Sequence, residues 1–86
     1  MLQTEVVIAN PLGLHAHPAT LFVKKAMGFS SEVKLSKDDR EVDGKSVLSI
    51  LTLAVEKGDK VTLTVSGKDE REAFYTLKSF LEGNIG

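Results

Sequence analysis

The stretch Gly13-Leu14-His15-Ala16-His17-Pro18-Ala19 places a histidine immediately ahead of a helix. Proline suits the first helical position, because its fixed backbone angle matches a helix and its missing N–H has no partner to lose there. Pro18 therefore predicts a helix that runs to about Met27. His15 lies just before the free amides of the first turn, where the positive end of the helix dipole stabilises negative charge. The stretch predicts a phosphate site.

His15 is accordingly a candidate to accept a phosphoryl group and pass it on. An imidazole is largely neutral at cell pH and can act as a nucleophile. Its bond to phosphorus is labile, so the group can move on while the helix amides stabilise its charge. The alternative is a loop histidine that caps the helix or is exposed by chance.

On both sides of this stretch, hydrophobic periodicity predicts six further elements. Asp69, with Glu72 three residues later, can form a capping box at the start of the last helix. In chain order, the sequence predicts a strand over 2–8, the helix over 18–27, a hairpin over 32–43 with its turn at 36–39, a short helix over 46–53, a strand over 60–66 and a helix from Asp69 to Leu81.

This βαββαβα order predicts a two-layer α+β fold whose helices cover one face of a sheet. The 86 residues make one domain, 1–86, with a modest core and little room for a separate catalytic lobe. A carrier or adaptor is therefore favoured over an enzyme, and no cofactor is expected.

Composition excludes several partners. Eleven Lys and Arg residues oppose twelve Asp and Glu residues without a basic run, which disfavours nucleic acid. No cysteine is present for a disulfide or a thiolate metal site. Because the N-terminus does not read as a signal peptide and the apolar runs are too short to span a membrane, we expect a cytoplasmic protein.

The opening stretch resembles the active-site signature of HPr, the histidine-containing phosphocarrier family of the bacterial phosphotransferase system. That signature runs Gly, aliphatic, His, Ala, Arg, Pro, small, and six of the seven positions match. Lys45-Ser46-Val47-Leu48 resembles the family's regulatory-serine segment, and the element order agrees from Leu2 to about Leu81. The resemblance implies an open-faced β-sandwich, with a four-stranded antiparallel sheet and three helices on one face.

The resemblance also implies a function and partners. Enzyme I, which draws on phosphoenolpyruvate, would phosphorylate His15 at Nδ1, and the group would pass to the A domains of sugar-specific enzymes II. We expect a monomer that turns over no substrate itself. The main alternative is a regulatory paralogue of the same fold, which transfers phosphate poorly and acts through Ser46 and partner docking.

His17 is the departure, because the family has arginine at this position. Imidazole still offers a donor to the phosphoryl oxygens, without the permanent charge and planar fork of arginine. Alternatively, the site is retuned for another partner or has lost transfer activity. A third interpretation is a metal-binding module built on His15 and His17, although a tight site needs three or four ligands.

Ser46 opens the short helix, where a serine N-cap contributes about 1 kcal/mol. The resemblance adds a regulatory function, because a kinase/phosphorylase phosphorylates this serine in many bacteria and couples sugar flux to gene control through a transcriptional regulator. A phosphate at an N-cap suits the helix dipole.

Apolar residues on the outer faces of the first two helices predict a docking surface next to His15 and Ser46. A helix lying on a sheet can bury only one stripe, yet the helix at 46–53 is apolar nearly all round. In the HPr family the matching positions meet partner proteins. The predicted surface, called the docking patch below, consists of Thr20, Leu21, Lys24, Met27, Val47, Leu48 and Leu51.

Overall fold

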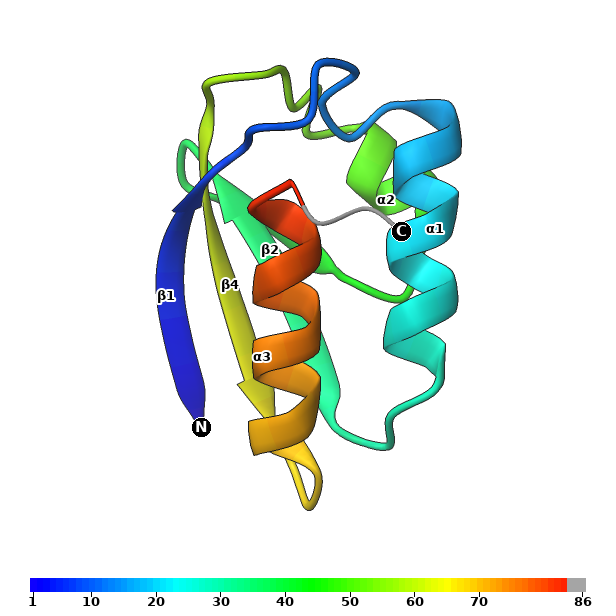
Figure 1. Cartoon of the computed structure of the whole chain (residues 1–86), viewed down its shortest axis with the longest axis vertical. Helices are drawn as coiled ribbons and strands as arrows, with labels where there is room; N and C mark the ends of the chain where they lie inside the picture. Colours follow the sequence, from blue (N-terminus) through cyan, green and yellow to red (C-terminus); the bar gives the residue numbers. More distant parts are fainter. Residues whose placement is uncertain (84–86) are drawn as a thin grey trace.

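The computed structural model describes residues 1–83 and places three helices on one face of a four-stranded sheet (Figure 1). The predicted element order and open-faced β-sandwich are confirmed. Within the described residues, no helix is long and apolar enough to cross a membrane. The elements are β1 (Leu2–Val7), α1 (Ala16–Met27), β2 (Glu32–Lys37), β3 (Arg40–Asp43), α2 (Val47–Leu51), β4 (Lys60–Ser66) and α3 (Glu70–Leu81).

The sheet is antiparallel throughout, with the strand order β1-β4-β2-β3. Along β4, buried valine and leucine residues alternate with partly exposed threonines, as expected for a strand with one covered face. Val6 lies opposite Val61, and Leu35 lies opposite Leu63. This register brings the apolar residues of three strands onto the face that the helices cover.

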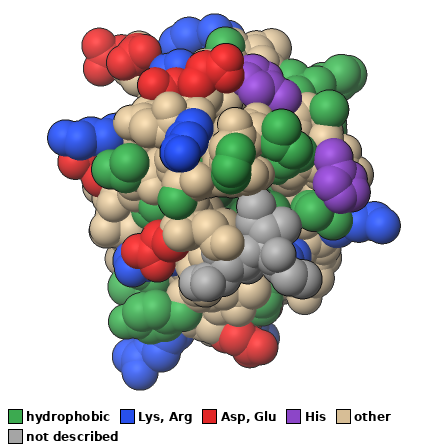
Figure 2. Space-filling model, turned by 45° about the horizontal axis from the view of Figure 1, so that its top comes forward, with side chains coloured by type: hydrophobic (Ala, Val, Ile, Leu, Met, Phe, Trp, Pro, Cys, Tyr) green, Lys and Arg blue, Asp and Glu red, His purple; other side chains and the backbone are tan. Residues whose placement is uncertain are grey.

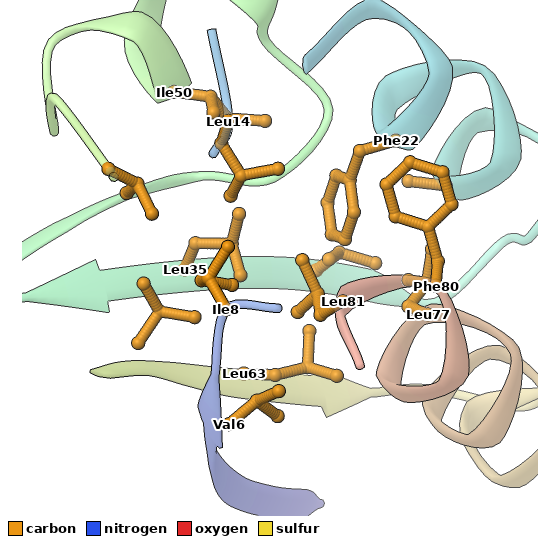
Figure 3. Close-up of a cluster of buried hydrophobic side chains, with 14 of the residues drawn as sticks. Val6, Ile8, Leu14, Phe22, Leu35, Ile50, Leu63, Leu77, Phe80 and Leu81 are labelled. Atoms are coloured by element: carbon orange, nitrogen blue, oxygen red, sulfur yellow. The ribbon is translucent and has the colours of Figure 1, made fainter. Parts of the chain in front are cut away.

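The core lies between the sheet and the helices (Figure 3). Phe22 of α1 packs against Phe80 of α3, with ring centroids 6.0 Å apart. Leu14, from the loop before α1, and Ile50 of α2 belong to the same buried cluster. The start of α1 and the short helix α2 are therefore both anchored to the body of the protein.

The hairpin between β2 and β3 has a tighter turn than the predicted 36–39. The strands continue to Lys37 and resume at Arg40, so only Asp38 and Asp39 form the turn. Both have positive φ, +50° and +68°. Two-residue turns of this kind match the twist of the paired strands, and aspartate tolerates the conformation better than most residues.

Helix α1 begins at Ala16, two residues before the predicted start, and His15 is its N-cap. Pro18 thus occupies the third helical position. The prediction was wrong because the amide of that position also precedes the intrahelical hydrogen bonds, so proline is tolerated there as well.

Helix α2 ends at Leu51 and not at residue 53 as predicted. The N–H groups of Thr52, Leu53 and Ala54 donate to carbonyls three residues earlier, at 3.0–3.2 Å, which tightens the end of the helix. Ala54 then adopts a φ of +51°, outside the helical region.

Asp69 is the N-cap of α3, but the predicted capping box is wrong. Its carboxylate accepts hydrogen bonds from the backbone of Ser30 and Ser31, each at 2.9 Å, and from the Ser31 hydroxyl. The Glu70 carboxylate instead accepts the N–H of Gly67 at 3.1 Å. Asp69 therefore connects α3 to the loop before β2.

Candidate phosphoryl-acceptor site

Asn10 folds the loop between β1 and α1. Its carbonyl accepts the N–H of Gly13 at 2.9 Å, and its side-chain oxygen accepts the N–H of Leu12 at 3.2 Å. Its side-chain amide donates to the carbonyl of Gly13, also at 3.2 Å. Leu14 follows this turn into the core, so the chain enters α1 from a fixed point.

Gly13 is needed because two backbone segments approach closely. Its φ is +62°, and a Cβ at this position would lie 2.2 Å from the carbonyl oxygen of Val55. The N–H of Leu14 donates to the same carbonyl at 3.0 Å. The residues that follow on each segment, His15 and Glu56, are thereby brought together.

His15 has extended backbone at the mouth of α1, with φ −100° and ψ 159°. The first helical hydrogen bond runs from the N–H of Ala19 to the His15 carbonyl at 3.4 Å. The amides of Ala16 and His17 precede this hydrogen bond and have no partner within the helix, so they are left to bind water or an anion. The third position, Pro18, has no N–H. The His15 side chain is 44% exposed, which leaves the imidazole accessible to a partner.

Glu56 contacts the His15 ring, with 2.6 Å between Nε2 and Oε2. Sequence reasoning did not find this residue. The two positions are 41 residues apart, and nothing in the local pattern around Glu56 distinguishes it from an ordinary surface carboxylate. The contact involves Nε2, so Glu56 does not engage Nδ1.

His17 is exposed at the second position of α1. In Figure 2 the two histidine side chains form separate purple areas on one face, with apolar side chains between them and acidic side chains beside one of them. Within residues 1–83, no group of three His, Cys, Asp or Glu residues is arranged to hold a metal ion.

Ser46 is the N-cap of α2, as predicted. Its hydroxyl oxygen accepts the N–H of Ser49 at 3.3 Å, which satisfies one of the free amides at the helix start. The side chain is partly buried.

The docking patch divides into two parts. Thr20, Lys24, Met27 and Leu48 are exposed, and the last two have exposed fractions of 64% and 77%. Helices α1 and α2 are in contact, so the patch crosses a junction between them. The half-buried members, which also pack against the core, are Leu21, Val47 and Leu51.

The fold and the site together are those of a small histidine-containing carrier protein. Residues 2–83 match the family described as PTS HPr component phosphorylation site. The chain belongs to the HPr family, whose members are phosphocarriers of the phosphotransferase system and not enzymes.

Known proteins are similar to this chain over most or all of its length. The phosphocarrier protein HPr of Neisseria meningitidis is 40% identical over 86 residues, covering 100% of this chain and 97% of that protein. HPr of Thermoanaerobacter tengcongensis aligns with a TM-score of 0.92 and 41% identity, over 95% of this chain and 92% of that one. Crh of Bacillus subtilis, whose crystal structure is a domain-swapped dimer, aligns with a TM-score of 0.80 and 40% identity, over 100% and 99%.

Proposed function

We propose that this protein accepts a phosphoryl group on Nδ1 of His15 from enzyme I and passes it to enzyme II A domains. The observation that carries the proposal is an exposed imidazole at the mouth of α1, next to amides that precede the helical hydrogen bonds. The whole chain acts as one domain, in the cytoplasm and as a monomer.

The transfer itself needs little from the protein. Nδ1 attacks phosphorus, the Nδ1–P bond forms and the bond between phosphorus and the donor breaks. The amides of Ala16 and His17 are placed to stabilise the phosphoryl oxygens through the helix dipole. The His17 imidazole adds a donor, weaker than the arginine of the family pattern.

Incubation with phosphoenolpyruvate and enzyme I tests the proposal directly. Intact-mass measurement should report one added phosphoryl group, labile in acid and stable in alkali. The His15→Ala variant should remain unmodified under the same conditions. Labelling of that variant to the level of the parent would contradict the assignment of His15.

We further propose that an HPr kinase/phosphorylase phosphorylates Ser46, and that the modified protein binds a transcriptional regulator. Its position supports this, because a dianion at the start of α2 would add charge beside the docking patch. Ser46→Asp should therefore raise the apparent KM of enzyme I for this protein while the fold survives, since aspartate is also a good N-cap. An unchanged KM would contradict this.

A regulatory role with poor phosphotransfer is the second candidate. The similarity to Crh and the presence of His17 favour it. The enzyme I assay separates the two candidates, because a regulatory paralogue would take up phosphate on His15 slowly or incompletely. Sedimentation of the purified protein would test the monomer, since a swapped dimer would sediment as twice the mass.

A further inference from the structure

We propose that Glu56 is a positioning residue for His15, whose carboxylate holds the Nε2–H of the ring and leaves Nδ1 as the free nucleophile. This inference rests on the proposed phosphoryl transfer. It starts from the contact of 2.6 Å between Nε2 and Oε2, which joins residues 41 positions apart. An ionised carboxylate can only accept, so the nitrogen that it contacts carries the proton.

The backbone brings these two side chains together. The N–H of Leu14 donates to the carbonyl of Val55 at 3.0 Å, one residue before His15 and one residue before Glu56. Leu14 and Val55 are both buried in the core. The pair therefore sits on two segments that are held in register, and less ordering is needed than for two independent surface side chains.

The segment that carries Glu56 is also fixed from its other side. The Asp59 carboxylate accepts the backbone N–H of Glu56 at 2.8 Å and forms an ion pair with Lys37 at 2.9 Å. These two contacts hold the pKa of Asp59 below its ordinary value. Lys37 also donates to the carbonyls of Leu53 and Ala54, at 3.3 Å and 2.9 Å. The hairpin β2–β3 thus supports the position of Glu56.

The contact between Glu56 and His15 would stabilise the charge that the ring gains during phosphoryl transfer. When the Nδ1–P bond forms, the donor keeps the electron pair of its broken bond to phosphorus, and Nε2 keeps its proton. The ring then carries a positive charge, which the neighbouring carboxylate offsets. When the phosphoryl group leaves for the next acceptor, the ring returns to the neutral form with the proton still on Nε2.

Repulsion between Glu56 and the incoming phosphoryl group opposes this effect. The two nitrogens of an imidazole point away from each other, so the carboxylate lies on the side of the ring remote from Nδ1. Solvent screens both the attraction of the carboxylate to the charged ring and its repulsion from the phosphoryl group. The side chains are 44% exposed for His15 and 66% exposed for Glu56. We therefore expect an effect of about two- to fivefold on the rate.

The first measurement needs no partner protein. Nitrogen-15 shifts of the His15 ring, recorded above the pH at which the ring is charged, report which nitrogen carries the proton. In the parent we expect the Nε2–H form, and in Glu56→Ala a measurable share of the Nδ1–H form. Glu5→Ala is the matched control, because Glu5 is an exposed carboxylate on the open face of the sheet. Identical ring shifts in the parent and Glu56→Ala would overturn the proposal.

The second measurement is the rate of transfer from phosphorylated enzyme I. Glu56→Ala should lower the saturating rate about two- to fivefold and leave the half-saturating concentration unchanged, with Glu5→Ala matching the parent. A purely structural role would lower the melting temperature without changing the ring shifts. Faster transfer in Glu56→Ala would overturn the proposal, because it would mean that the pair restrains the nucleophile.

Different results would contradict the carrier function and the role of Glu56. If the parent takes up no phosphate, the proposed function is wrong. If the parent and Glu56→Ala take it up at the same rate, the carrier function stands and the role of Glu56 is wrong.

Discussion

His15 is an N-cap whose ring contacts Glu56. Serine or aspartate at an N-cap normally accepts a hydrogen bond from an amide of the first turn and stabilises the helix by about 1 kcal/mol. An imidazole held by a carboxylate leaves those amides for another ligand. At the scale of the residue, the site therefore favours anion binding over the stability of α1.

Two substitutions at position 15 measure how much stability α1 lacks because its N-cap is a histidine. His15→Ser supplies a hydroxyl that can accept the N–H of His17, whereas His15→Ala cannot, and neither variant retains a phosphorylatable histidine. We expect the serine variant to be more stable by about 0.5–1 kcal/mol in denaturant unfolding. Equal stability of the two would indicate that the first-turn amides are not available to a ligand.

His17 stands where the family pattern has arginine. If it acts as a weakened arginine, His17→Arg should speed phosphoryl transfer about tenfold, which corresponds to ~1.4 kcal/mol of added transition-state stabilisation. His17→Lys is the control, because it supplies charge without the planar fork and should gain less. A slower arginine variant would instead indicate partners adapted to imidazole.

The apolar residues of helix α2 fall into a buried group and an exposed group. Ile50 is fully buried and anchors the helix to the core, whereas Leu48 is 77% exposed on the outer side. Val47 and Leu51, which lie between these extremes, are partly covered by the core. At the scale of the element, one short helix both joins the fold and presents an apolar surface next to Ser46.

Substitution of these two residues should separate the tasks. Leu48→Ala should leave the melting temperature within error and raise the apparent KM of enzyme I for the protein, because it removes only an exposed contact. Ile50→Ala should destabilise the protein by about 2–5 kcal/mol in chemical unfolding. A collapsed melting temperature for Leu48→Ala would place that residue in the core, and an unchanged KM would place the interface elsewhere.

At the scale of the whole molecule, carboxylates join segments that are distant in sequence. Asp69 connects the start of α3 to the loop after α1, and hydrogen bonds from the Ser31 hydroxyl and the Ser30 amide hold the pKa of Asp69 below its ordinary value. The pKa of Glu70 is lowered by the amide of Gly67 and by the N-terminus. Each group binds its proton less readily in the folded chain than in the unfolded chain.

These shifts predict how stability changes in acid. Because the folded pKa values lie below the unfolded ones, the unfolded chain takes up protons first as the pH falls. The contribution of these groups to stability is fully present above about pH 5 and is lost as the pH falls through the folded values. Asp69→Asn should lower stability at pH 7 and flatten the acid limb of the curve. Denaturant unfolding between pH 7 and pH 2 measures both effects. The Glu5→Gln variant should follow the parent, and an unchanged acid limb in Asp69→Asn would contradict the prediction.

Periodicity in the sequence predicts the elements, their order and most of the core, because helical and strand periodicities are local patterns that each segment carries alone. The sequence also identified His15 at the mouth of a helix and Ser46 as an N-cap. The errors at the start of α1 and the end of α2 are shifts of two residues, where several positions satisfy the same capping rules.

The contacts between groups that are distant in sequence depend on the tertiary structure. The carboxylate of Glu56 reaches His15 because Leu14 pairs with Val55, and the Asp69 carboxylate binds Ser31 and not an amide of its own helix. Neither contact has a local signal, since each joins segments about 40 residues apart and depends on the packing of the helices against the sheet. Periodicity specifies which face of an element is buried, and packing specifies what lies beside it.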